Sequence, residues 1–176
     1  MIKKGLLNII VKFHNKTINK LILKKAKRLV VPTMDFIESS NIHSIYKKNE
    51  TLFSFIPNGV DTEKFTPSDD EGDGTFNIGY VRALDNAHHH GGLDLVIDAI
   101  KDIDEKLLLH IIGDGELKTH YKNYVKKYDV NEKVIFHGKI ENEKMPQFYN
   151  KFDVLTLPSK ITENFPLVVL EAGSCG

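Results

Sequence analysis

The sequence has little cysteine: Cys175 is the only one among 176 residues. A single thiol excludes an intramolecular disulfide and a multi-cysteine metal site, and it fits a reducing compartment. We therefore expect a cytoplasmic protein. Hydrophobic residues make up 41% of the chain, which is sufficient for a buried core, and the length predicts one globular domain or little more.

Long apolar runs are missing as well. The chain begins with the basic stretch MIKKGLLNIIVKFHNK, in which the apolar run LLNIIV spans only six residues and ends at Lys12. Such a run is short for the hydrophobic segment of a signal peptide and far too short to cross a bilayer. We predict neither a targeting segment nor a membrane span here.

Acidic residues are absent from the first 34 positions, which hold nine Lys or Arg. Four lysines recur at intervals of four and so line one face of a predicted basic amphipathic helix within residues 3–28. They are Lys12, Lys16, Lys20 and Lys24. A solvated surface helix explains this pattern, and peripheral contact with an anionic membrane surface is the alternative. No nucleic-acid partner is expected, because the rest of the chain is acidic and would repel phosphate backbones.

Polar and turn-forming residues mark a boundary inside the chain. The stretch DTEKFTPSDDEGDG shows no periodicity and predicts a linker at residues 61–75. Before it, within residues 1–60, we predict a strand in RLVVPT, a helix at 35–46 and a strand in TLFSFIPNGV. After it, residues 76–176 alternate between apolar runs and helical patterns and form a second domain.

The second domain is predicted to be α/β. Continuous apolar runs of the kind found in parallel sheets predict four strands, at 76–81, 107–113, 134–138 and 154–159. Helices are predicted between and after them, at 91–102, 115–129, 144–151 and from Pro166 onward. Four consecutive strand–helix units imply right-handed crossovers and a doubly wound, Rossmann-like parallel sheet.

This topology predicts where a ligand binds. In the common strand order 3-2-1-4, the first and fourth strands are neighbours, and a crevice opens at their carboxyl ends. The loops at that point are residues 82–91 and 160–166. We expect the sequence TENFPLVVLEAG to face RALDNAHHHGG across this crevice.

The residues of the fourth loop suit an anionic ligand. We predict Pro166 at the first helical position and Phe165 at the N-cap, so that the amides of Leu167 and Val168 lack a side-chain acceptor. Free amides at the positive end of a helix bind phosphate, unless Asn164 or Thr162 caps the helix instead.

Two carboxylates accompany this phosphate site. Glu163 precedes the helix and is expected to face hydroxyl groups, because a phosphate would repel it. Glu171 lies inside the apolar run LVVLEAG and needs donors, which a ribose diol supplies. A phosphate, a sugar and a ribose in one crevice describe a nucleotide sugar.

Five segments in order resemble the retaining GT-B glycosyltransferases of group 1, also called family 4. They are IPNGVDTEKF, IIGDGE, VIFHGKI, MPQFYNKFDVLTLPS and ENFPLVVLEAGSCG, the last with the Glu-x7-Glu spacing of that family. The resemblance implies a GT-B fold: the end of an N-terminal acceptor domain in residues 1–60, followed by an incomplete donor domain in residues 76–176. It also implies transfer of a hexose from a UDP-, GDP- or ADP-sugar to a glycan or lipid-linked acceptor, with no catalytic metal.

The resemblance assigns roles to residues that match the family's motifs. Glu163 would contact the donor sugar, and Glu171 would bind the ribose. The diphosphate would be held by the segment that follows Glu163, and the base would face backbone near the end of the third strand. These donor-binding residues are Asn164, Phe165, Pro166, Leu167 and Val168 for the diphosphate, and Gly138, Lys139 and Ile140 for the base.

The loop after the first strand departs from the family pattern. A lysine that stabilises the departing diphosphate is expected there, but Gly91 stands in its place and Arg82 stands where a glycine is usual. We expect Arg82 to replace that lysine as a catalytic cation and His88 to contact phosphate. The run His88-His89-His90 is not expected to bind metal, because consecutive histidines in a loop cannot all face one ion.

Other interpretations remain open. Family members carry a whole acceptor domain before these motifs and a further strand after them, so the resemblance implies a fragment that is inactive alone. A non-catalytic remnant that only binds nucleotide sugars is the alternative. A dehydrogenase-like or phosphorylase-like domain is disfavoured by Glu-x7-Glu, and the GDG at 113–115 has Lys118 where a dinucleotide motif needs glycine.

Overall fold

The computed structural model describes residues 17, 19–68, 73–161 and 163–176. The chain divides into two compact units, and the boundary follows Pro57. This boundary lies earlier than the one predicted from the sequence. Within the second unit, Phe65 is only 3% exposed and its ring packs against Tyr149, while Ser174 donates a hydrogen bond to its carbonyl. The predicted linker therefore includes a core residue. The sequence did not indicate this, because Phe65 is surrounded by polar and turn-forming residues.

The first unit is a small parallel pair of strands with helices. Its elements are α2 (Asn19–Lys25), β1 (Leu29–Val31), α3 (Met34–Ser39), α4 (His43–Tyr46) and β2 (Phe53–Phe55). The strands pair in parallel, and Val31, Ile37 and Phe53 form the buried core. The helix predicted at 35–46 is broken in two, because Ser40 adopts an extended backbone at the end of α3. Most of the predicted basic helix lies outside the described residues, so its membrane role stays a prediction.

The second unit carries the predicted α/β alternation. Its strands are β3 (Phe76–Val81), β4 (Leu107–Ile112), β5 (Val134–Gly138) and β6 (Val154–Leu155), and its α-helices are α5 (Leu93–Ile100), α6 (Lys118–Lys127), α7 (Met145–Tyr149) and α8 (Leu167–Cys175). All strand pairs are parallel, and the order β5-β4-β3-β6 is the predicted 3-2-1-4. β6 is shorter than predicted, because the chain turns at Pro158, where the amide of Ser159 bonds to the carbonyl of Leu157.

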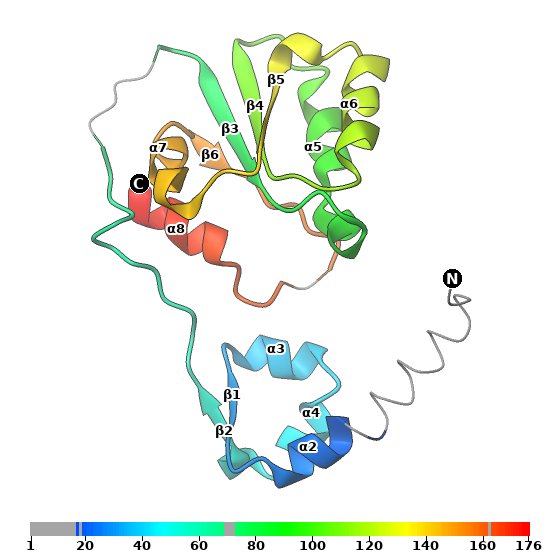
Figure 1. Ribbon diagram of the computed structural model, residues 1–176, viewed down its shortest axis with the longest axis vertical. Helices are drawn as coiled ribbons and strands as arrows, with labels where there is room; N and C mark the ends of the chain where they lie inside the picture. Colours follow the sequence, from blue (N-terminus) through cyan, green and yellow to red (C-terminus); the bar gives the residue numbers. More distant parts are fainter. Residues whose placement is uncertain (1–16, 18, 69–72, 162) are drawn as a thin grey trace. The chain divides into compact units, whose positions relative to one another are not determined.

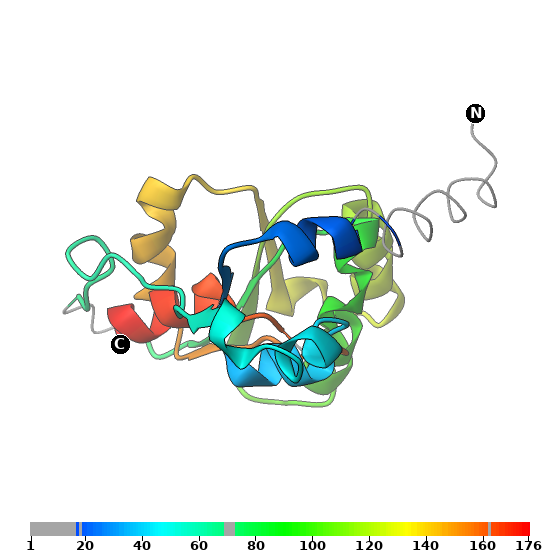
Figure 2. The same cartoon turned by 90° about the horizontal axis from the view of Figure 1, so that it is seen from below.

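Each face of this sheet is covered by a different pair of helices. α5 and α6 lie on one side, and α7 and α8 lie on the other (Figures 1 and 2). Strand alternation explains the division, because successive side chains of β4 point to opposite faces. Leu109 and Ile111 are fully buried in the core beneath α5 and α6, whereas Ile112 belongs to the core with Met145 of α7 and Cys175 of α8.

Backbone hydrogen bonds tie together the loops that follow the strands. The amide of Arg82 bonds to the carbonyl of Ile112 at 2.9 Å, and the amide of Gly113 bonds to the carbonyl of Gly138 at 2.8 Å. Gly113 has a φ of +144°, and a Cβ there would overlap the carbonyl of Arg82. Only glycine fits this close approach. The backbone bonds hold the carboxyl ends of β3, β4 and β5 next to one another.

Candidate functional site

A pocket of about 520 Å³ lies at the carboxyl ends of β3, β4 and β5 and beside α7 and α8. It lies at the carboxyl end of the strands, as predicted, and includes Arg82 of the first predicted loop. No residue of the second predicted loop, 160–166, lines it. The pocket brings together five of the predicted site residues, which come from two different loops and α8. They are Arg82, Lys139, Ile140, Val168 and Glu171.

Helix α8 begins one residue later than predicted. Pro166 is the N-cap, with φ −68° and ψ 124°, and Leu167 is the first helical residue. The prediction of Phe165 as N-cap is wrong: it adopts a left-handed φ of +54°, and its carbonyl accepts a hydrogen bond of 2.9 Å from Asn58. This turn, which includes the exposed Asn164, leads the chain into the helix.

The first amides of α8 have no side-chain acceptor. Pro166 cannot cap the helix with its side chain, and the first backbone bond at this end joins the amide of Val169 to the carbonyl of Pro166. No described side chain accepts a hydrogen bond from the amides of Leu167 or Val168. Among the described residues, the helix therefore starts with two N–H groups that no side chain caps, at the positive end of its dipole. Thr162, one of the two alternative caps, lies outside the described residues.

Glu171 lies one turn inside α8 and lines the pocket. Its Oε2 accepts a hydrogen bond of 2.7 Å from the hydroxyl of Tyr149, which fixes the carboxylate. Burial, together with this hydrogen bond, raises the pKa of Tyr149, so the hydroxyl stays protonated and remains a donor. The other oxygen, Oε1, has a long contact of 3.5 Å with the side-chain Nδ2 of Asn142. It retains capacity to accept a hydrogen bond from a ligand.

Arg82 joins the pocket to Glu163. Its Nη1 donates to Oε1 of Glu163 at 2.6 Å and to the hydroxyl of Ser159 at 2.8 Å. The same Ser159 hydroxyl contacts the Glu163 carboxylate. Arg82 extends from the end of β3 and Glu163 from the loop before α8, so the two predicted catalytic residues form an ion pair across the switch point.

The environment keeps Glu163 ionised. Partial burial by itself raises the pKa of this carboxyl, but the hydrogen bonds from Ser159 and Arg82 and the charge of Arg82 outweigh it and hold the pKa below its ordinary value. The pair at neutral pH is therefore a guanidinium and a carboxylate. Glu163 does not line the pocket. Arg82 does, and it is paired with Glu163 outside the lining.

The three consecutive histidines have three different partners. They lie in the 3₁₀ segment η3 (Asn86–Gly91): His88 contacts Asp85 at 2.7 Å, His89 contacts the carbonyl of Asn86, and His90 contacts Nη2 of Arg82 at 3.4 Å. His88 is exposed and lies outside the pocket lining, so its phosphate contact stays a prediction. In the described residues no three His, Cys, Asp or Glu side chains are grouped to hold a metal ion, and the metal-free reaction likewise stays a prediction.

The loop predicted to face the base begins at Gly138, which has a φ of +75° and ends β5. Lys139 and Ile140 follow it and line the pocket, whereas Gly138 does not. Asp114 lies at the same rim, where its carboxylate is paired with Lys118 at 2.6 Å. The loop and α8 thus line the same pocket, and contact of the loop with a base stays a prediction.

Sequence reasoning missed several residues of the site. Tyr149 and Asn142 hold Glu171, and Ser159 and His90 contact Arg82. Tyr149 had a detectable signal: it follows Met145 by four positions, so both lie on one face of the predicted helix. Ser159 and His90 had no such signal in the sequence, because a contact between two loops depends on the path of each loop.

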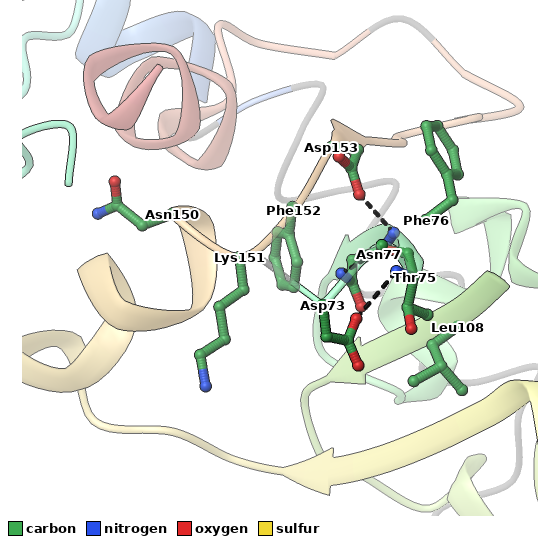
Figure 3. A pocket seen from close by; sticks show the side chains of 10 residues that line it. Asp73, Thr75, Phe76, Asn77, Leu108, Asn150, Lys151, Phe152 and Asp153 are labelled. Carbon is green, nitrogen blue, oxygen red and sulfur yellow. Dashed lines mark hydrogen bonds between the residues drawn. The ribbon is translucent and has the colours of Figure 1, made fainter. Parts of the chain in front are cut away.

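A second hollow, of about 570 Å³, lies at the opposite, amino end of the strands (Figure 3). Its two carboxylates accept hydrogen bonds from the protein's own backbone. Asp153 accepts a hydrogen bond of 2.6 Å from the amide of Asn77, and Asp73 accepts one of 2.9 Å from the amide of Thr75 (Figure 3). These carboxylates complete the start of β3, which gives them a structural role.

None of the helices in the described part of the chain is both long enough and apolar enough to cross a membrane.

Comparison with known proteins agrees with this geometry. Residues 64–176 match the family described as Glycosyl transferases group 1. An uncharacterized glycosyltransferase of Methanocaldococcus jannaschii is 34% identical over 120 residues, which are 68% of this chain and 31% of that protein. The UDP-Gal:alpha-D-GlcNAc-diphosphoundecaprenol alpha-1,3-galactosyltransferase of Escherichia coli is 33% identical over 136 residues, which are 70% of this chain and 34% of that enzyme.

Solved structures show the same fold. Anabaena HepE in complex with UDP-glucose superposes with a TM-score of 0.73 at 18% identity, covering 89% of this chain and 44% of that one. The fold is therefore α/β of the GT-B type. The chain spans about a third of the length of the curated relatives it matches. Because the family match covers well over half of its residues, the chain belongs to the group 1 glycosyl transferases.

Proposed function

We propose that this chain provides the donor site of an enzyme that transfers a hexose from a UDP-, GDP- or ADP-sugar to a glycan or lipid-linked acceptor, with retention of configuration and without a catalytic metal. One observation carries the proposal. A pocket at the switch point of the sheet contains a half-buried carboxylate, Glu171, and a cation, Arg82, beside the uncapped start of α8. These groups match the ribose and the diphosphate of a nucleotide sugar.

The relatives support the same substrate class. The name of the Escherichia coli relative specifies a UDP-galactose donor and a diphosphoundecaprenol-linked acceptor, and the Anabaena structure contains UDP-glucose. A non-catalytic remnant is not favoured, because no observation on the chain requires it.

Each group has a role in this proposal. The amides of Leu167 and Val168 hold the diphosphate, and Oε1 of Glu171 accepts from the ribose diol. The base lies along the backbone from Gly138 to Ile140, and Glu163 contacts the sugar. Arg82 stabilises the diphosphate as it departs, a contribution of roughly 2 to 4 kcal/mol to the transition state.

The start of α8 offers a direct test, because one backbone donor can be removed without breaking the helix. Leu167→Pro deletes the amide at the first helical position, where proline is well tolerated. The preceding Pro166 already has the extended ψ of 124° that a following proline requires. We expect UDP, GDP or ADP, whichever binds best in calorimetry, to bind about tenfold more weakly, because one hydrogen bond to a charged phosphate is lost.

Leu167→Ala is the matched control, since it shortens the same half-exposed side chain and keeps the amide. Its affinity for the nucleoside diphosphate should equal that of the wild type. The nucleoside without phosphates should bind all three proteins equally. Equal diphosphate binding by the proline and alanine variants would show that α8 does not hold the diphosphate.

A further inference from the structure

Arg82 stands between two places where an anion can lie. Its side chain is 10% exposed and lines the pocket, while its Nη1 is bonded to Glu163, outside the pocket lining. We propose that Arg82 changes partner during donor binding: it holds the Glu163 carboxylate in the empty site and binds the donor diphosphate in the filled site, which releases Glu163 toward the sugar. This inference rests on the proposed function.

The guanidinium has donors to offer. Of its five N–H groups, the two on Nη1 bond to Glu163 and Ser159, and Nη2 makes only a long contact of 3.4 Å with Nε2 of His90. The Nε atom is buried and has no hydrogen-bond partner among the described residues. Nη2 is therefore the group with spare donors, and phosphate oxygens are the acceptors that bind guanidinium most strongly in two-point contacts.

The stem of Arg82 is enclosed, so the arginine itself stays in place. It passes over Gly91, where a Cβ would lie 2.7 Å from Cδ of Arg82 and would also overlap the hydroxyl of Tyr80. Glycine at position 91 thus makes the space that the arginine occupies. The exchange is a change of partner at the tip of a fixed side chain, and Glu163 is the partner that is displaced.

Charge decides the direction of the exchange. In the structure the guanidinium and the carboxylate neutralise each other, and among the described residues Ser159 alone provides Glu163 with a second hydrogen bond. A diphosphate carries more negative charge than one carboxylate, and it is also held by the first amides of α8. Once Arg82 turns its donors to the diphosphate, repulsion drives the Glu163 carboxylate away from the phosphates, and the hydroxyl groups of the sugar satisfy it.

The proposal predicts that Glu163 competes with the nucleotide for Arg82. Glu163→Gln removes the competing charge and keeps an acceptor for Ser159 and Arg82. We expect this variant to bind the nucleoside diphosphate at least threefold more tightly than the wild type in calorimetry, while the nucleoside without phosphates binds equally to both. Glu163→Ala, which removes the acceptor as well, must change the affinity in the same direction.

The matched control is Asp94→Asn, which breaks a different ion pair of the same loop, that between Asp94 and Lys160 at 2.6 Å. It changes the net charge equally and should leave diphosphate affinity within twofold of the wild type. Equal or weaker diphosphate binding by both Glu163 variants overturns the exchange and leaves the proposed function standing. If the wild type binds none of UDP, GDP and ADP, the proposed function fails and the exchange fails with it.

Discussion

The two ends of the second unit's sheet carry hollows of similar size and different chemistry. The amino end has about 570 Å³ and the carboxyl end about 520 Å³, so volume does not distinguish them. At the amino end, Asp153 and Asp73 accept hydrogen bonds from the backbone at the start of β3. At the carboxyl end, no described side chain accepts from the first amides of α8, and Glu171 retains an oxygen for a ligand.

Both ends face the same physical problem and solve it differently. The first N–H groups of a strand or helix lack partners within their own element, and each must find an acceptor. The protein's own carboxylates provide it at one end. At the other end, no described side chain provides it, and we propose that a ligand does. The proposed binding end of this sheet is therefore distinguished by backbone donors without a described acceptor, and not by the size of its hollow.

The largest expected effect belongs to Glu171 at the carboxyl end. Glu171→Gln keeps an acceptor for the hydroxyl of Tyr149 but removes the charge that we propose binds the ribose diol. We expect nucleoside diphosphate affinity to fall by about 1.5 to 3 kcal/mol, roughly 10- to 150-fold, with the free energy of unfolding nearly unchanged. Calorimetry and urea denaturation measure the two quantities.

Glu143→Gln provides the control, because Glu143 is close in sequence to the site but its side chain is 79% exposed. It should bind nucleotide as the wild type does. Retention of full affinity by Glu171→Gln would remove Glu171 from the ribose site.

Asp153 at the amino end should show the opposite pattern. Asp153→Asn replaces a charged acceptor with a neutral one at the amide of Asn77, which we expect to lower the free energy of unfolding by about 1 kcal/mol. Nucleoside diphosphate affinity should not change, since the pocket that binds it lies at the far end of the strands. The exposed Asp104→Asn is the control for the loss of one charge. Weaker nucleotide binding by Asp153→Asn would erase the distinction between the two ends.

Much of this architecture could be predicted from the sequence. The apolar runs FNIGYV and VIFHG matched β3 and β5 to the residue, because strands buried on both faces consist of little but apolar residues. The strand order agrees with the common doubly wound order 3-2-1-4, and the pocket lies at the carboxyl end of the strands that this order predicts. Glu171 was predicted to need donors because it interrupts an apolar helix, and Tyr149 provides one.

Contacts between loops could not be predicted. The sequence indicated Arg82 as a cation beside the site but gave no sign of its ion pair with Glu163, 81 positions away. Gly91 was noted only as a missing lysine, whereas the structure shows that a side chain there would collide with Arg82. The start of α8 was misplaced by one residue, because Pro166 satisfies the backbone requirements of both the N-cap and the first helical position.

A row of polar side chains crosses the sheet between its two ends. Nε2 of His137 donates to Nδ1 of His110 at 2.9 Å, and Nε2 of His110 donates to Oδ1 of Asn77 at 2.9 Å. The directions follow from Asn77, whose Nδ2 donates to the carbonyl of Thr75, so its Oδ1 must accept. The lowered pKa values of both histidines favour the neutral forms, and with His110 neutral its Nδ1 is the acceptor and Nε2 of His137 the donor. The three side chains of this row are thus linked to one another.

The smallest expected effect is the response of this row to pH. Burial is the main cause that lowers the pKa of His110, and the nearby charges of His137 and Lys151 lower it further. Burial also lowers the pKa of His137, with a smaller effect from the charge of Lys151. The unfolded chain binds protons at about 6.5, above the folded values, so the stabilisation is complete above that pH and is lost as the pH falls below it. We expect the free energy of unfolding, measured with urea, to decrease from pH 7.5 to pH 5.5.

The double variant with His110→Gln and His137→Gln should show a smaller decrease than the wild type. The control His120→Gln, which alters an exposed histidine, should show the same decrease as the wild type. An equal decrease in all three proteins would mean that this row, unlike the ion pair at the carboxyl end, does not depend on protonation.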